Sequence, residues 1–109
     1  MRQLNFESFR NTEKSQLDGA YVFAFDTCEL CKMFETELRT VYGHRTKNWT
    51  VVETILESDK EYVRSIAPEY KVSPFTAVFK HGEPVFQRNG VLYATQMQKA
   101  LDAMEECDD

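Results

Sequence analysis

Two cysteines separated by two residues, in the segment Cys28-Glu29-Leu30-Cys31, carry the clearest chemistry in this sequence. The pair follows the apolar run 20–25 and opens a stretch with helical periodicity. Two thiols at this spacing can alternate between a dithiol and a disulfide, and the same spacing supplies half of many metal sites. In a reducing compartment such a pair is more often catalytic or metal-binding than a structural disulfide. The pair therefore predicts either redox chemistry or metal binding.

The place of the pair at a helix start predicts different tasks for the two thiols. A thiolate is the reactive form of cysteine, and the free N–H groups and the dipole at a helix N-terminus stabilise negative charge. We expect Cys28 to be the more exposed and more easily ionised thiol, which attacks a disulfide. Cys31 should point inward and resolve the mixed disulfide. The charge of Glu29 opposes ionisation of Cys28, whereas the Leu30 N–H is a donor within reach of the Cys28 sulfur.

A metal site requires further ligands, and the sequence has few to offer. It contains no second CxxC motif and no closely spaced histidine pair of the kind found in zinc sites. The other soft ligands are His44, His81 and Cys107, and Cys107 lies in an acidic tail that we expect to fray. Cys107 itself is interpreted as an idle thiol, with oxidative dimerisation or regulation as alternatives. We therefore favour redox chemistry over a zinc or iron–sulfur site, and over two incidental cysteines.

The order of apolar and polar segments predicts an α/β sandwich built on one central sheet. Helices are expected over Asn5–Gln16, Cys28–Tyr42 and Asp59–Ala67, with a final helix from Thr95. Strands are expected over residues 20–25, Trp49–Leu56, Phe75–Lys80 and Pro84–Arg88. Because proline cannot donate to a central ladder, Pro84 places the last strand at a sheet edge.

Capping residues define the expected helix ends. Asn5 is expected as the N-cap of the first helix, and Gly43 as the stop of the second. The patterns 58–61 and 95–98 are capping boxes that open the third and fourth helices.

The overall composition sets limits on the class of protein. A chain of 109 residues with 42% hydrophobic residues predicts one globular domain over residues 1–109. Its net charge of -5 does not favour binding to nucleic acid or to an anionic membrane, because both are negatively charged. The sequence shows neither a membrane-spanning run nor the apolar core of a signal peptide. We therefore expect a cytoplasmic protein with no nucleic-acid or membrane partner.

Several segments together resemble the thioredoxin family over almost the whole length. The segment from Phe23 to Lys32, which contains the cysteine pair, is similar to the family's active-site strand and helix. Pro74 stands five residues before Phe79-Lys80-His81-Gly82-Glu83, as in the family's proline, strand and hairpin. The stretches 5–9 and 90–92 resemble the family's opening helix and its late glycine loop. A glutaredoxin is less similar, because only Gly90 stands where that family carries a glycine pair.

The resemblance implies a thioredoxin-like three-layer sandwich with a central mixed β-sheet flanked by helices. It also implies a cis Ser73–Pro74 bond, in a loop that lies against the dithiol and pairs with an extended substrate peptide. The residues expected to contact substrate are Thr27, Glu29, Leu30, Ser73, Pro74, Phe75 and Gly90. Phe75, Val91 and Leu92 are either an apolar rim around the thiols or ordinary core residues.

The chain departs from the family at five positions near the pair. Thr27 replaces the usual tryptophan, and Glu29-Leu30 replaces Gly-Pro. Val22 stands where the family has a buried acid, and Glu53 falls near the family's partner lysine. Glu53 is either a substitute proton acceptor or a solvent-facing strand residue.

The resemblance implies a thiol-disulfide oxidoreductase that reduces protein disulfides with Cys28 as nucleophile and Cys31 as resolving thiol. Such a protein needs no bound cofactor and no metal, is expected to be a monomer, and takes electrons from a thioredoxin-reductase-type donor. An alternative remains, because fold does not determine function. The chain could be a thioredoxin-like binding subunit that stabilises a partner protein without redox chemistry.

Overall fold

A five-stranded mixed sheet lies between two pairs of helices in the computed structural model, which describes residues 1–25, 27–54 and 56–107 and side chains through Met104. The strands are β1 (Arg2–Leu4), β2 (Gly19–Ala24), β3 (Thr50–Glu53), β4 (Phe75–Lys80) and β5 (Glu83–Asn89). The helices are α1 (Phe6–Arg10), α2 (Glu29–Thr40), α3 (Glu57–Ile66) and α4 (Ala94–Cys107), with a 3-10 turn, η1, at Lys14–Gln16. The roles considered for the Cys107 thiol lie outside the described side chains.

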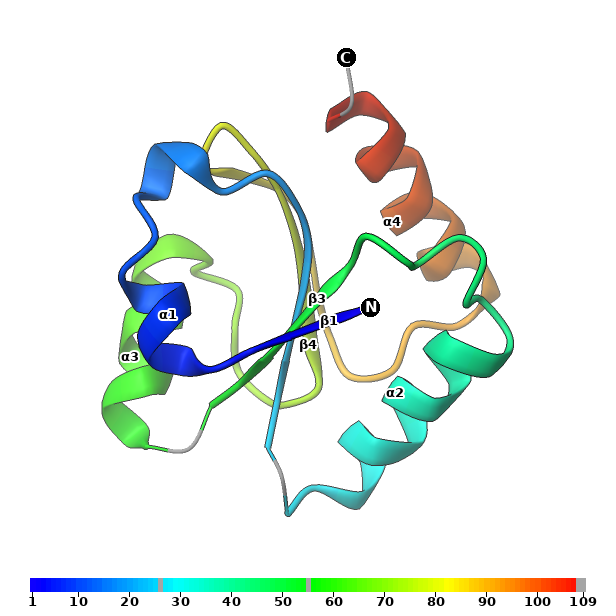
Figure 1. Ribbon diagram of the computed structural model, residues 1–109, viewed down its shortest axis with the longest axis horizontal. Helices are drawn as coiled ribbons and strands as arrows, with labels where there is room; N and C mark the ends of the chain where they lie inside the picture. Colours follow the sequence, from blue (N-terminus) through cyan, green and yellow to red (C-terminus); the bar gives the residue numbers. More distant parts are fainter. Residues whose placement is uncertain (26, 55, 108–109) are drawn as a thin grey trace.

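The strand order is β1-β3-β2-β4-β5. Strands β1, β3 and β2 run parallel, and β4 and β5 are antiparallel to their neighbours. As Figure 1 shows, α1 and α3 cover one face of the sheet and α2 and α4 cover the other. The predicted three-layer sandwich with a central mixed sheet is confirmed, and β5 lies at an edge as Pro84 required.

Strand β2 is the centre of the fold because both of its faces are covered. Tyr21 and Phe23 pack among the aromatic residues beneath α1 and α3. The alternate residues Ala20, Val22 and Ala24 pack beneath α2 and α4. A continuous apolar run is the pattern expected of a strand buried on both sides. The cysteine pair follows shortly after the end of this strand in the sequence.

The N-terminal segment differs from the prediction. The structure has a short strand, β1, which was not expected, and the helix predicted over Asn5–Gln16 is split into α1 and η1. Asn5 does cap α1, since its Oδ1 accepts a hydrogen bond from the Ser8 N–H at 2.8 Å. After Phe9 the next buried side chain is Leu17, so no apolar stripe holds the intervening residues in one helix.

Helix ends also differ in detail from the capping predictions. α2 ends at Thr40, before Gly43, and its C-cap Val41 has ordinary right-handed geometry. α3 begins earlier than expected, and the Asp59 carboxylate accepts a hydrogen bond from the Leu56 N–H at 3.0 Å. Thr95 lies inside the first turn of α4 and is not its cap. Among the described residues, no helix has the length and apolar character needed to cross a bilayer.

The loop after α2 is held by a buried threonine. Thr46 is fully buried, and its Oγ1 lies 3.1 Å from both the Leu38 and Tyr42 carbonyl oxygens. We expect Thr46→Val to lower the free energy of unfolding by about 1–3 kcal/mol, because buried acceptors lose their donor. Thr40→Val is the matched control, since its hydroxyl bonds the Thr36 carbonyl at an exposed site. Urea unfolding of both variants checks this, and equal losses would contradict it.

Candidate active site

Cys28 occupies the N-cap position of α2. Its backbone is extended, and its Sγ accepts a hydrogen bond from the Cys31 N–H at 3.1 Å. The sequence had pointed to the Leu30 N–H as the donor; the donor in the structure belongs to Cys31. The Cys28 side chain is partly exposed, so an incoming disulfide can reach it. A sulfur at this position receives both the hydrogen bond and the positive end of the helix dipole, which stabilise a thiolate.

Cys31 has the opposite environment. Its side chain is completely buried in the layer between the sheet and α2, in the same cluster as Val22 and Phe34. The pKa of the Cys31 thiol is raised from 9.0 to about 12, chiefly by burial and next by a hydrogen bond with the Cys28 sulfur. A backbone hydrogen bond at Phe25 acts in the opposite direction. Both thiols are free in the structure, and Cys31 is held in its protonated form beside the Cys28 sulfur.

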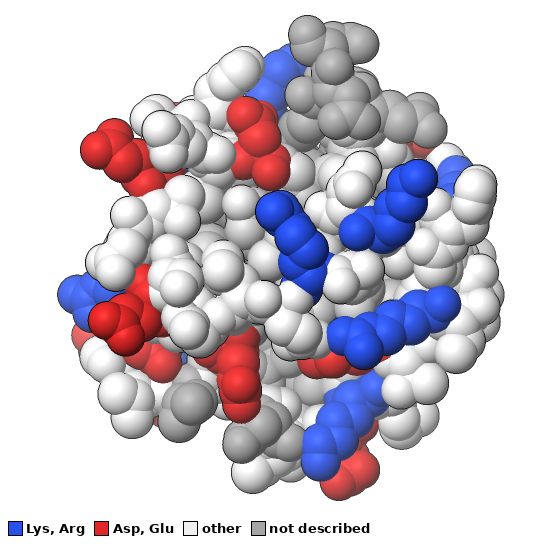
Figure 2. All heavy atoms as spheres, viewed as in Figure 1, with Lys and Arg blue, Asp and Glu red and all other residues white. Residues whose placement is uncertain are grey.

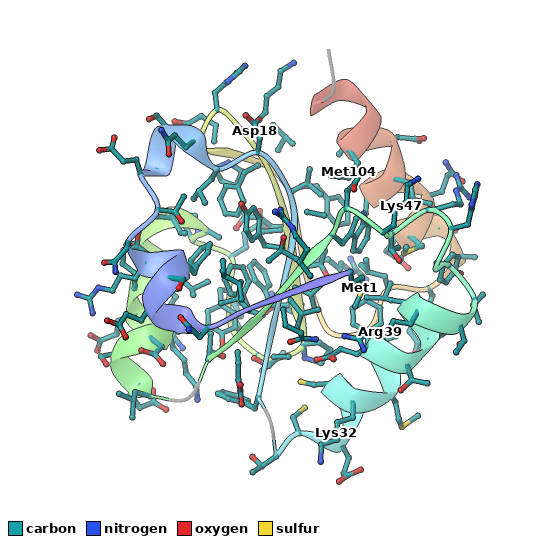
Figure 3. The ribbon with its side chains drawn as sticks, in the orientation of Figure 1. Met1, Asp18, Lys32, Arg39, Lys47 and Met104 are labelled. Atoms are coloured by element: carbon teal, nitrogen blue, oxygen red, sulfur yellow. The ribbon has the colours of Figure 1, made fainter. Side chains whose placement is uncertain are left out.

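Charged residues next to the pair point into solvent. The Glu29 side chain is 86% exposed and lies 3.9 Å from the Lys32 ammonium, a distance typical of a weak surface pair. Figure 3 shows Lys32 in the first turn of α2. Thr27 and Leu30 are also exposed. These side chains therefore surround the partly exposed thiol without covering it.

The loop before β4 reaches the same end of the sheet as the pair. The Ser73–Pro74 peptide bond is cis. Phe75 is opposite Phe23 in the register of β2 and β4, and opposite Asn89 in that of β4 and β5. The Gly90 N–H donates to the Pro74 carbonyl at 2.7 Å. Residues from the end of β2, the start of β4 and the end of β5 thus meet at one edge of the molecule.

Most of the residues considered for an apolar rim around the thiols are buried in the core. Phe75 is fully buried and packs against Tyr70 in a tilted arrangement, with ring centroids 5.0 Å apart. Leu92 is also buried, and Val91 is half-buried. Phe75, one of the predicted contact residues, is therefore a core residue next to the loop, and its side chain is not accessible to a partner. The exposed apolar side chains near this end of the sheet are instead Leu30, Leu56, Val72 and Tyr93.

The side chain of Asn89 holds the loop before β4 in place, whereas the sequence predicted only a turn at this residue. Its Oδ1 accepts hydrogen bonds from the Lys71 N–H at 2.7 Å and the Val72 N–H at 3.0 Å. Its Nδ2 donates to the Glu69 carbonyl at 2.7 Å. One side chain at the end of β5 therefore fixes the segment that leads into Ser73 and Pro74. The Asn-Gly dipeptide at 89–90 was the one available clue.

Removing this side chain should loosen the loop. We expect Asn89→Ala to lower the free energy of unfolding by about 1–3 kcal/mol, because three hydrogen bonds are lost at a partly solvated site. The KM for a protein disulfide should rise while alkylation of Cys28 continues at the wild-type rate. Arg88→Ala is the matched control, since its exposed side chain lies on the same strand. A control variant as impaired as Asn89→Ala would count against this role.

Val22 and Glu53 are the two positions near the pair that the sequence linked to proton transfer from Cys31. Val22 is fully buried, so the site that holds an acid in thioredoxins is apolar here. Glu53 is half-buried and pairs with Ala24 in the register of β2 and β3. It lines the wall of a cavity between the sheet and α2. Within residues 1–25, 27–54 and 56–107, no group of three or more His, Cys, Asp or Glu side chains is placed to hold a metal ion.

Comparison with known proteins establishes the fold. No protein-family model matches the sequence, and no curated protein matches it. Thioredoxin f2 of Chlamydomonas reinhardtii is similar in structure, with a TM-score of 0.66, 24% identity and coverage of 98% of this chain and 97% of that chain. Spinach chloroplast thioredoxin f has a TM-score of 0.64 and 13% identity over 99% and 86% of the two chains. Mitochondrial thioredoxin 3 of Saccharomyces cerevisiae, in its oxidised form, has a TM-score of 0.63 and 18% identity over 94% of each. The chain therefore has the thioredoxin fold, with a CxxC-spaced cysteine pair at the start of α2.

Proposed function

We propose that this protein is a thiol-disulfide oxidoreductase that reduces protein disulfides. The observation that carries the proposal is the contrast between the two sulfurs of the pair. Cys28 is partly exposed and accepts a hydrogen bond at a helix N-terminus, whereas Cys31 is buried beside it as a thiol. This contrast supplies an accessible nucleophile and a protected resolving group.

The proposed reaction has two exchange steps. The Cys28 thiolate attacks one sulfur of the substrate disulfide, which breaks that bond and releases the other substrate sulfur as a thiolate. The new bond is a mixed disulfide between Cys28 and the substrate. Cys31 then loses its proton and attacks the Cys28 sulfur, which releases the second substrate thiolate. The substrate gains two electrons, and the Cys28–Cys31 pair is oxidised to a disulfide.

A protein substrate suits the surface around Cys28. The loop at 72–74 precedes β4 at the end of the sheet that also carries the pair, and we propose that an extended substrate peptide lies alongside it. The exposed side chains of Leu30 and Val72 offer apolar contacts on either side. We propose Thr27, Glu29, Ser73, Pro74 and Gly90 as the further residues that substrate contacts.

The cycle needs an external source of electrons. We propose a thioredoxin-reductase-type donor that reduces the Cys28–Cys31 disulfide, in a reducing compartment such as the cytoplasm. We further propose that the protein acts as a monomer and without a bound cofactor, since both electrons pass through the pair.

Reduction of insulin in the presence of dithiothreitol tests the proposal. The wild-type protein should accelerate precipitation of the insulin B chain, and Cys28→Ser should not exceed the rate with dithiothreitol alone. A wild-type rate equal to that of Cys28→Ser would refute the reductase. Capture of a partner that survives Cys28→Ser/Cys31→Ser would point instead to the binding subunit.

A further inference from the structure

The second exchange step requires a group that accepts the proton of Cys31. Cys31 must give up a proton before its sulfur can attack Cys28, and the pKa of Cys31 is raised to about 12. Val22 has no group that can accept that proton. A proton acceptor must therefore come from another residue near Cys31 or from water that reaches it.

A cavity lined by α2, the helix that carries Cys31, contains the candidate groups. Its volume is about 230 Å³, enough for several water molecules, and it lies between α2 and the ends of β2 and β3. Ala24 and Phe25 form its wall on the side of the pair, and Glu35 and Glu53 are its two carboxylates. The backbone of Phe25 also hydrogen-bonds the Cys31 sulfur. Cys31 does not itself line the cavity, but the wall residue Ala24 packs in the same buried cluster as Cys31.

Glu35 is the cavity carboxylate that shares a helix with Cys31. It stands four residues further along α2, so the two side chains lie on the same helix face. Its charge acts on Cys31, as one of the causes that raise the thiol pKa, whereas Glu53 is not among these causes.

Two polar side chains contact Glu35 at the cavity. The Gln3 Nε2 group donates to its Oε2 at 3.5 Å, and the Arg39 guanidinium lies 3.9 Å from the same atom. Lys32 lines the cavity from the preceding turn. Figure 3 shows Lys32 and Arg39 on the same side of α2, and Figure 2 shows that Lys and Arg side chains gather over this part of the surface. The Glu35 side chain keeps 26% of its exposure, so it also contacts solvent.

We propose that Glu35 accepts the proton of Cys31 during the resolving step, through water in this cavity. This proposal rests on the proposed function. The Cys31 S–H bond breaks, its proton passes to the Glu35 carboxylate, and the sulfur keeps the electron pair with which it attacks Cys28. The Cys28–substrate bond breaks, and the substrate leaves as a thiolate. Glu35 then releases its proton to solvent.

Substitution of Glu35 separates this role from a simple charge effect. The carboxylate charge opposes ionisation of Cys31 in the resting protein. Glu35→Gln therefore makes the Cys31 thiol more acidic, which by charge alone would speed its attack. Loss of the proton acceptor has the opposite effect and slows it. When Glu35 takes the proton, its charge disappears and no longer opposes the thiolate.

The experiment is single-turnover reaction of the reduced protein with dithiobis(nitrobenzoate), on a Cys107→Ser background. Attack by Cys28 releases the first coloured thiol, and attack by Cys31 releases the second. We expect Glu35→Gln to leave the first phase at the wild-type rate and slow the second about tenfold or more. Glu35→Asp, which keeps a carboxylate, should recover part of this loss. The pH midpoint for alkylation of Cys31 should fall in Glu35→Gln.

Two matched variants complete the design. Glu37→Gln removes a carboxylate from the exposed side of the same helix and should keep both phases unchanged. Glu53→Gln removes the other carboxylate of the cavity. A second phase in Glu35→Gln as fast as wild type would overturn the proposal, as would slowing in Glu53→Gln alone. If the wild-type protein releases no second thiol at all, the reductase itself fails.

Discussion

Replacing Cys31 with serine should turn the protein into a trap for its substrate. Cys28 stays exposed at the helix N-terminus and still attacks, but no thiol stands beside it to release the product. An intramolecular thiol has a very large kinetic advantage over one in solution, so resolution should slow by about a thousandfold or more. Incubation with a disulfide-bonded protein, followed by non-reducing electrophoresis and mass spectrometry, should show a stoichiometric mixed disulfide at Cys28.

The reciprocal variant is the control for the trap. Cys28→Ser keeps the buried thiol but loses the accessible one, and it should form no adduct under the same conditions. Equal adduct yields from the two variants would show that the division of roles between the sulfurs is wrong.

Alkylation at neutral pH should label Cys28 and spare Cys31. A pKa raised from 9.0 to about 12 lowers the thiolate fraction of Cys31 about a thousandfold at neutral pH, since each unit changes it tenfold. Its complete burial slows the reagent further. The Cys31 rate should rise steadily with pH up to about 12, because the ionised fraction grows over that whole range. Peptide mass spectrometry after iodoacetamide treatment, on a Cys107→Ser background, measures both sites.

A labelling pattern with Cys31 modified as fast as Cys28 would contradict the environment described for the pair. Unfolding in urea supplies the control, since both thiols should then react at similar rates. Slow labelling of Cys31 that persists after unfolding would mean that the folded environment is not the cause.

Much of the fold was predictable because its central elements have strong patterns. The apolar run at 20–25 and the strand Phe75–Lys80 are buried on both faces, and each appears in the structure close to its predicted limits. The helical stripe from Leu30 onward predicted α2 and placed Cys28 at its start. Strand β1 was missed because three residues, two of them polar, show no periodicity. It forms through parallel pairing with β3, an interaction distant in sequence.

The site was predictable where it depends on local sequence and not where it depends on tertiary contacts. The unequal exposure of the two cysteines follows from their positions on one helix. The side chain of Asn89 acts on residues seventeen to twenty positions earlier, which no local pattern reveals. Phe75 is core because β4 is covered on both faces. The cavity beside Glu35 exists only once α2 is packed on the sheet.

The apolar residue at position 22 bears on the direction of electron flow. Strongly oxidising dithiols owe their potential to a stabilised reduced form, in which a thiolate is favoured. Here Cys31 is held as a buried thiol, and the adjacent strand offers it no charged partner. A stabilised thiolate at Cys28, which accepts one hydrogen bond at the helix N-terminus, shifts the potential in the oxidising direction, and Cys31 adds nothing to that shift. With only this one contribution we expect the pair to remain reducing.

The reduction potential of the Cys28–Cys31 pair tests the reductase most directly. Equilibration with glutathione buffers of defined ratio, acid quenching and mass spectrometry on a Cys107→Ser background give the midpoint. We predict a value more negative than about -230 mV, beyond the range of glutaredoxins and towards that of thioredoxin. A midpoint of about -200 mV or higher would contradict the account, because such a pair would oxidise protein thiols or isomerise protein disulfides.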